Sequence, residues 1–147
     1  MADATITATL VATTAEAERA LGGKKDVRLK YCPFKVGRES RTETVAGSFV
    51  HLRGTAPPLN DLYLVEPSWA DLMQVSREHF MIDQFEGEFV LIDRGSSLGT
   101  LVNGQRVGGQ RQGGRVVLHN GDLITVGNER SEYIFRFQSP DLPPRPR

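Results

Sequence analysis

Residues 75–104 read V-S-R-E-H-F-M-I-D-Q-F-E-G-E-F-V-L-I-D-R-G-S-S-L-G-T-L-V-N-G, and this stretch decides the fold of the chain. Two short runs within it, Phe80–Ile82 and Phe89–Ile92, have the apolar and β-branched residues that are typical of strands. Glu86 and Gly87 lie between the runs and favour a tight turn. We therefore expect the two runs to pair as a β-hairpin.

Polar residues gather where this predicted hairpin opens. One cluster is Ser76-Arg77-Glu78-His79, and the other covers Ser96–Thr100. A further arginine, Arg38, follows the strand-like run Phe34–Val36. Hydroxyls, guanidinium groups and loop amides would meet at one edge of a rigid sheet, and these are the donors that a phosphate group needs.

Composition limits the partners that the chain is expected to have. Its 147 residues are enough for one domain with a real core, and 18 basic residues balance 18 acidic ones. A neutral chain lacks the positive field that drives binding to nucleic acids or anionic membranes, so we expect neither as a partner. The single cysteine, Cys32, excludes an internal disulfide. We find no signal peptide and no run near the ~20 apolar residues of a membrane span, and expect a cytoplasmic protein.

The other turn and strand signals predict an all-β sandwich or barrel with one short helix. The strongest turn signal is Asn103-Gly104, because both residues tolerate a positive φ. Thr13–Glu16 fits a capping box, followed by helix formers and closed by two glycines. Further strands are expected at Thr5–Ala12, Val27–Tyr31, Phe34–Val36, Ser48–Leu52, Asp61–Val65, Leu101–Val102, Gln105–Val107, Val116–Leu118, Leu123–Val126 and Tyr133–Phe137. We expect one domain over 1–139, with an irregular insertion at about 39–60, and a proline-rich tail over 140–147.

Five fragments, in this order, resemble the forkhead-associated (FHA) domain family over roughly residues 27–137. They are Gly37-Arg38, Ser76-x-x-His79, Ser96-x-x-Gly99-Thr100, Asn103-Gly104 and Gly121-Asp122-x-Ile124-x-Val126-Gly127. The resemblance implies a β-sandwich of about eleven strands with adjacent termini. It also implies that loops at one end recognise phosphothreonine in an extended peptide, and hence a phosphothreonine-dependent binding module in signalling.

The resemblance also implies roles for single residues. Arg38 would contact the phosphate or the peptide, and the Ser76 hydroxyl would donate to a phosphate oxygen. The expected phosphopeptide-binding set is Arg38, Ser76, Arg77, Ser97, Leu98 and Gly99. Residues expected to shape the site are Gly37, His79, Thr100 and Asn103, with His79 bonding inside the loops rather than to ligand.

Two departures from the family pattern favour an alternative function. The family usually has asparagine before Gly-Thr, where its amide bonds the peptide backbone, but this chain has Leu98. A leucine makes no such hydrogen bond, a loss of about 1 kcal/mol. The 39–60 segment also separates Arg38 from Ser76 by more residues than is typical. The alternative is a phosphate-independent interaction or self-association module on the same fold.

Catalytic and metal sites are not expected. Ser76, His79 and Asp93 have the residue types of a hydrolase triad, but a G-x-S-x-G elbow is missing. The three histidines and Cys32 lack the spacing of metal ligands. No glycine fingerprint for a nucleotide is found either, so we expect a binding protein without enzyme activity, metal or cofactor.

Overall fold

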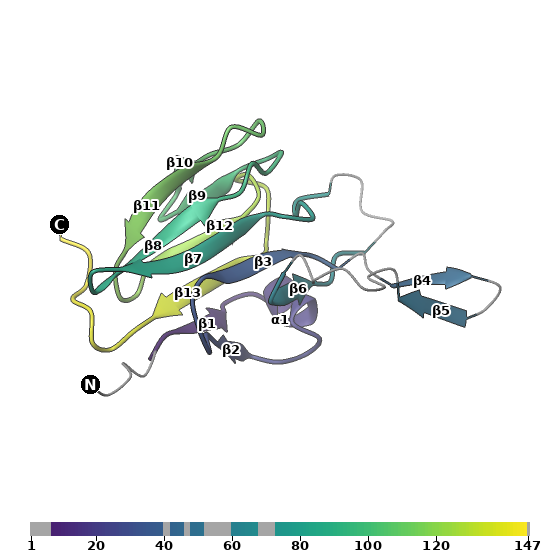
Figure 1. The fold of residues 1–147 in the computed structure, drawn as a ribbon, viewed down its shortest axis with the longest axis horizontal. Helices are drawn as coiled ribbons and strands as arrows, with labels where there is room; N and C mark the ends of the chain where they lie inside the picture. Colours follow the sequence, from purple (N-terminus) through teal and green to yellow (C-terminus); the bar gives the residue numbers. More distant parts are fainter. Residues whose placement is uncertain (1–6, 40–41, 46–47, 52–59, 68–72, 147) are drawn as a thin grey trace.

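The computed structural model describes residues 7–39, 42–45, 48–51, 60–67 and 73–146. Two sheets, in which most strand pairs are antiparallel, pack face to face, as Figure 1 shows. The six-stranded sheet has the order β10 (Gln105–Val107), β9 (Thr100–Val102), β12 (Leu123–Val126), β13 (Ile134–Gln138), β1 (Thr9–Ala12), β2 (Asp26–Arg28). The five-stranded sheet has the order β11 (Gly114–Leu118), β8 (Glu88–Asp93), β7 (Phe80–Phe85), β3 (Phe34–Arg38), β6 (Leu62–Leu64). Eleven strands thus form the sandwich, and the predicted all-β class is confirmed.

The predicted central hairpin is β7 and β8. Phe80 pairs with Asp93 and Phe85 pairs with Glu88, so Glu86 and Gly87 make the turn with positive φ values of 50° and 85°. Alternation along the pair sends Phe80, Ile82, Phe89 and Leu91 into the core. The two polar clusters therefore do flank the open end of this hairpin.

The core lies between the two sheets. Phe80, Ile82 and Leu91 of the five-stranded sheet are fully buried, as are Ile124 and Phe135 of the other sheet. The rings of Phe89 and Phe137 meet edge to face, with centroids 5.4 Å apart. Burying each large apolar side chain contributes about 1.5–3 kcal/mol, so this layer provides the rigid base for the loops.

The described part of the chain contains one short helix, α1 (Ala15–Ala20), which packs Ala17 and Ala20 against the sandwich. The capping box predicts Thr13 as the N-cap, but Thr14 takes this place, and its Oγ1 accepts a hydrogen bond of 3.0 Å from Ala17 N–H. Thr13 instead donates its hydroxyl to Ile134 O, because its backbone still pairs with β13. The helix thus begins one residue later than the pattern indicates.

The segment between β3 and β6 crosses from one strand to a parallel neighbour. Val36 pairs with Leu62 and Arg38 with Leu64 in the one parallel ladder among the described strands. Within the segment, β4 (Thr42–Val45) pairs with β5 (Ser48–His51), in agreement with the strand expected at 48–52 up to its last residue, which lies outside the described residues. Residues 40–41, 46–47 and 52–59 of the insertion, and Trp69, also lie outside the described residues.

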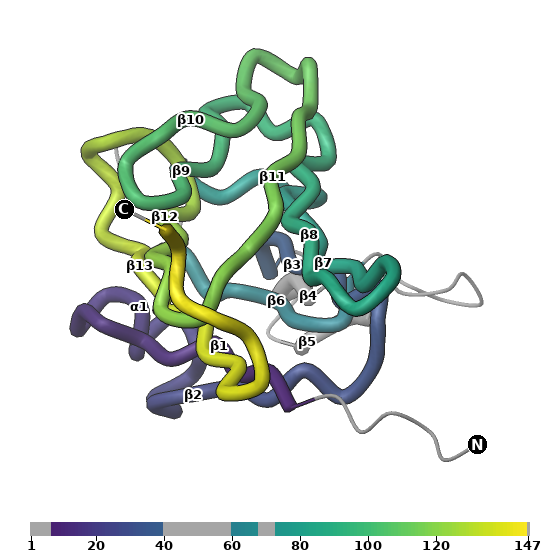
Figure 2. Tube along the Cα trace, turned by 90° about the vertical axis from the view of Figure 1, so that its left-hand side faces the viewer, coloured from purple at the N-terminus to yellow at the C-terminus, as the bar shows by residue number. Residues whose placement is uncertain are grey.

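The first described residues lie beside the start of the C-terminal segment. β1 pairs with β13, and Thr7 Oγ1 donates to Asp141 Oδ2 at 2.7 Å. Figure 2 shows the yellow C-terminal segment running back along the ends of β11 and β12, where Arg145 Nη2 donates to Val117 O at 2.8 Å. The division at residue 139 stays a prediction, although the described part of the proline-rich segment contacts the sandwich.

Candidate functional site

The loop that carries Ser76 and Arg77 is fixed against strand β3 by backbone hydrogen bonds. Arg38 N–H donates to Ser76 O at 2.9 Å, and His79 N–H donates to Val36 O at 3.0 Å. Gly37 lies between these bonds, and a β-carbon built on it would lie 1.9 Å from Arg77 O. Only glycine therefore fits at this position, because the loop approaches the strand backbone directly.

His79 connects this loop to the second one from a fully buried position. Its Nδ1 accepts a hydrogen bond of 2.9 Å from Ser76 N–H, so the ring proton is on Nε2, which donates to Gly99 O at 2.7 Å. Burial lowers the pKa of His79 and outweighs the Gly99 carbonyl and Asp93, which act to raise it. The imidazole is therefore neutral and links the two loops through its hydrogen bonds.

Asp93, at the end of β8, organises the 96–100 loop. Its Oδ1 accepts from Gly95 N–H and Ser96 N–H at 2.9 and 2.8 Å. Its Oδ2 accepts from the hydroxyls of Ser96 and Thr100 at 2.6 and 2.8 Å. Ser96 Oγ in turn accepts from Gly99 N–H at 2.9 Å. A buried carboxylate with four donors around it fixes the loop in one conformation.

Ser76 and Ser97 join the two loops at the surface. Ser97 N–H donates to Ser76 Oγ at 3.0 Å. A hydroxyl has one donor and two acceptor positions, so this bond leaves the Ser76 O–H group able to donate to a ligand. Ser97 is exposed and Ser76 half-buried, so the hydroxyl lies at the edge of solvent.

The two predicted arginines differ in how firmly the fold fixes them. Arg38 Nη1 donates to Val75 O at 3.1 Å, which directs the half-buried guanidinium toward the Ser76 loop. Among the described residues no other hydrogen bond uses its remaining donors, so most of the fork stays available. Arg77 is exposed, and among the described residues only its backbone carbonyl is fixed, because this oxygen accepts a hydrogen bond of 2.7 Å from Asn60 Nδ2.

Asn60 and Arg94 support the site but do not stand out in the sequence. Asn60 is only 4% exposed, and its Oδ1 accepts a hydrogen bond of 2.5 Å from Arg94 Nη1. Arg94 also pairs with Glu78 at 2.9 Å. The end of the 39–60 segment is thus tied to the Ser76 loop through side chains. This long-range link leaves no local pattern by which to predict it.

A third loop, residues 108–113, forms one side of the site. Gln110 N–H donates to Ser97 O and Arg111 N–H donates to Ser96 O, both at 2.9 Å. Gly99 and Gly109 pack backbone to backbone, and a β-carbon on Gly109 would lie 3.4 Å from Gly99 Cα. The glycines and glutamines of this loop carry no sequence signal for the contact, so the sequence analysis did not predict it.

The structure brings together nine of the ten residues that the sequence singles out. Arg38, Ser76, Arg77, Ser97 and Gly99 share the loop network with Gly37, His79 and Thr100, and half-buried Leu98 lies within it. Asn103 is the exception. It lies at the other end of β9, where its Nδ2 donates to Asp122 Oδ1 at 2.8 Å and its Oδ1 accepts from Leu123 N–H. The functional roles of the other nine remain predictions.

The same bonds show that Ser76, His79 and Asp93 are not arranged as a catalytic triad. The His79 ring bonds to backbone groups, Ser76 Oγ accepts from Ser97 N–H, and Asp93 bonds to its own loop. Within the described ranges no three His, Cys, Asp or Glu side chains gather as metal ligands. Nor does any described helix have the length and apolar character needed to cross a bilayer.

Solved structures share this fold over most of the chain. Mycobacterium tuberculosis EmbR, solved in complex with a low affinity phosphopeptide, superposes with a TM-score of 0.54 at 21% identity, over 95% of this chain and 25% of that one. The FHA domain of Chlamydia trachomatis CT664 gives a TM-score of 0.54 at 16% identity, over 90% and 96% of the two chains. An engineered FHA domain with Myc-pTBD peptide gives 0.57 at 21% identity, over 94% of each. This chain thus spans about a quarter of EmbR and nearly all of the other two.

Sequence comparison identifies the family. A search of curated proteins gave no match. The family model for the FHA domain matches residues 34–127, which is more than half of the chain and contains both site loops. FHA domains are protein interaction modules. Since the ordered motifs, the eleven-stranded sandwich and the family model agree, this chain belongs to the forkhead-associated domain family.

Proposed function

We propose that this protein is a phosphothreonine-dependent binding module that acts in cytoplasmic signalling. The observation that carries the proposal is the Ser76 hydroxyl, which accepts from Ser97 N–H and keeps its own proton for a ligand. The Arg38 guanidinium is directed to the same loop by its bond to Val75 O. A phosphate bound here would meet a hydroxyl donor and a charged fork together.

The energetics favour a phosphorylated ligand over a neutral one. Charge-assisted hydrogen bonds from a guanidinium to phosphate are about twice as strong as neutral ones. Arg77 is exposed beside Ser76 and adds a second cation on the solvent side. The chain as a whole has no net charge, so attraction is expected from these local groups and not from a general positive field.

The comparisons support this proposal through proteins of the same fold. EmbR was solved with a phosphopeptide, and the engineered FHA domain with the Myc-pTBD peptide. We infer a phosphothreonine-containing protein or peptide as the partner, without nucleic acid or membrane. The six site residues Arg38, Ser76, Arg77, Ser97, Leu98 and Gly99 would contact it.

The test is binding to one peptide library prepared with phosphothreonine, phosphoserine or unmodified threonine. Selective binding of the phosphothreonine set is expected. Arg38→Ala should weaken it by more than about 1 kcal/mol, because a charged hydrogen-bond partner is removed. Arg28→Ala is the matched control, since Arg28 is exposed on β2, in the other sheet. Equal affinity of the Arg38→Ala variant, with an unchanged melting temperature, would contradict the role of Arg38.

A second candidate is a phosphate-independent interaction or self-association module. It is favoured by Leu98, a half-buried apolar side chain at the place where the family has a peptide-binding asparagine. The same library distinguishes the two functions. Equal binding of phosphorylated and unmodified peptides, unaffected by Arg38→Ala, would favour the second candidate.

A further inference from the structure

The chain has a strongly basic segment despite its zero net charge. Residues 94–121 contain Arg94, Arg106, Arg111 and Arg115 and no aspartate or glutamate. This segment includes the Ser96–Thr100 loop and the 108–113 loop that packs on it. Three of these four arginines are exposed. Arg94 differs, because it pairs with Glu78 and bonds Asn60.

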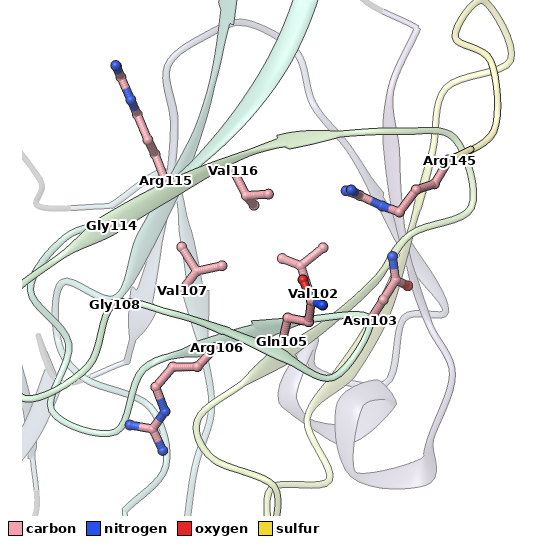
Figure 3. Close-up of a pocket in the computed structure, with 10 residues that line it drawn as sticks. All are labelled: Val102, Asn103, Gln105, Arg106, Val107, Gly108, Gly114, Arg115, Val116 and Arg145. Atoms are coloured by element: carbon pink, nitrogen blue, oxygen red, sulfur yellow. The ribbon is translucent and has the colours of Figure 1, made fainter. Parts of the chain in front are cut away.

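Arg106 lies beside the position where the family asparagine is missing. A β-carbon on Gly109 would lie 2.9 Å from Arg106 Nη1 and 3.4 Å from Gly99 Cα. The guanidinium therefore covers Gly109 next to Gly99, the neighbour of Leu98. In Figure 3 the Arg106 side chain points away from the adjacent cavity of about 350 Å³ between β10 and β11, so it does not fill that space.

Arg111 is positioned by an unusual backbone conformation. Gln110 and Arg111 have φ values of 53° and 63°, in the left-handed region that non-glycine residues rarely adopt. A non-glycine residue in this conformation costs on the order of 1 kcal/mol, so the surrounding contacts must stabilise the conformation. Those contacts are the bonds from Gln110 and Arg111 N–H to the carbonyls of Ser97 and Ser96. These hydrogen bonds keep the backbone of Arg111 at the rim of the site.

Neither Arg106 nor Arg111 has a partner among the described residues that would explain its place in the fold. Among the residues that the structure describes, no hydrogen bond or ion pair engages the guanidinium of Arg106 or of Arg111. Two exposed cations next to the proposed phosphate site provide a complementary surface for negative charge, because the nearby Asp93 carboxylate is buried and already bonded by its own loop.

We propose that Arg106 and Arg111 bind an acidic side chain of the partner, close to its phosphothreonine. This inference rests on the proposed function and defines the class of peptide that the site prefers. The contact lies on the Gly99–Gly109 side, where Leu98 cannot bond the peptide backbone. The 108–113 loop, rather than residue 98, then provides the peptide-side interaction.

The experiment compares the dissociation constants of two phosphothreonine peptide sets, which carry either glutamate or alanine in turn at each flanking position, and of the same two sets with unmodified threonine. Exposed charge pairs contribute little free energy, so the best glutamate peptide should bind about three- to fivefold tighter than its alanine counterpart. Arg106→Gln and Arg111→Gln should each reduce this ratio, and the double variant should bring it near one. Affinity for the alanine phosphopeptide should stay near the native value in all three variants.

Arg115→Gln is the matched control. Arg115 belongs to the same basic segment and is exposed, but Figure 3 shows its side chain leaving the cavity on the other side, away from Arg106. This variant should keep the full preference for glutamate. An added 0.5 M salt should reduce the preference in the native protein, because exposed charges are screened.

Each outcome separates this inference from the proposed function. A native protein that binds alanine and glutamate phosphopeptides equally, or a double variant that keeps the native ratio, would overturn the acidic contact alone. A glutamate preference that needs both arginines but is equal with and without phosphate would overturn the phosphothreonine function and leave the acidic contact standing. Binding that depends on neither phosphate nor flanking charge would overturn both.

Discussion

Two buried aspartates, Asp93 and Asp122, hold opposite ends of the sandwich in different ways. Asp93 accepts hydrogen bonds from two N–H groups and two hydroxyls, all within seven residues of it in sequence. Asp122 accepts from His119 N–H nearby, but also from Asn103 and from Arg145, which lies 23 residues away. The first is satisfied by neutral, local donors, and the second by distant donors that include a cation.

The difference follows from what each end must do. A local network fixes the shape of the 96–100 loop without placing a cation inside it, so the arginines near the site remain available to a ligand. A long-range network fixes the C-terminal segment against the ends of β11 and β12. One end of the sandwich thus carries the proposed binding site, and the other end holds the C-terminal segment.

Asp93→Ala should have the largest effect on this arrangement. It leaves two hydroxyls and two N–H groups of a buried loop without their acceptor, and each such group costs about 1–3 kcal/mol. We expect a loss of about 3 kcal/mol or more in the free energy of unfolding, measured by urea denaturation. Asp26→Ala, at an exposed position of β2, is the control. A loss no larger than that of the control would mean that the loop does not depend on Asp93.

Arg145→Gln tests the other end and should cost less, about 1–2 kcal/mol, because the guanidinium is partly exposed. Burial acts to raise the pKa of Asp122, but the bonds from Arg145, His119 N–H and Asn103 outweigh it, and the pKa lies below 3.8. The stabilisation is therefore present above pH 3.8 and lost as pH falls through the lowered value.

The difference between native protein and Arg145→Gln should accordingly shrink in urea titrations below pH 3.8. Arg130→Gln, at an exposed position, should show no such dependence. A difference that is constant from pH 7 to pH 3 would mean that Arg145 acts through packing alone.

Leu98→Asn leaves both aspartate networks intact and changes only the surface they support. Restoring the amide should tighten phosphothreonine peptide binding by about 1 kcal/mol through bonds to the peptide backbone. Isothermal titration with one phosphopeptide measures this directly, and the melting temperature should change little. Unchanged affinity would indicate that the peptide does not pass over residue 98.

The smallest predicted effect is the contribution of His79 to the pH dependence of the free energy of unfolding. Its pKa is lowered mainly by burial, so the unfolded chain binds a proton near pH 6.5 that the folded protein does not. Stability should therefore fall as pH decreases below 6.5, and this part of the slope should be absent in His79→Gln. Urea midpoints between pH 7.5 and 5.5 give the comparison. Parallel profiles for the two proteins would contradict the neutral buried state.

Local signals account for what could be predicted from sequence. Glu86-Gly87 and Asn103-Gly104 specify turns, and the alternation around them specifies which side chains are buried, so the hairpins follow directly. Even the assembly of both polar clusters follows from one hairpin. The ordered FHA motifs also predict the β-sandwich as a whole.

Contacts between distant residues could not be predicted in this way. Asn60 reaches Arg77 O from the end of the long segment, and Gly109 packs on Gly99. Val116–Leu118 and Leu123–Val126 flank one turn, yet β11 and β12 belong to different sheets. Such pairings are set by the packing of the whole sandwich, which no local spacing encodes.

The parallel pairing of β3 with β6 suggests a use for the domain as a sensor scaffold. Glu39 N–H bonds to Leu64 O, and Asp61 N–H bonds to Lys35 O, so the chain leaves the sheet at one end of the short β3–β6 ladder and re-enters it at the other end. Doubling the length of a loop with fixed ends costs only about 0.6 kcal/mol. A fluorescent reporter grafted between β4 and β5 would belong to the segment that ends at Asn60, whose Nδ2 bonds Arg77 O, and a change in its signal on ligand binding would report on the Ser76 loop without a redesign of the sandwich.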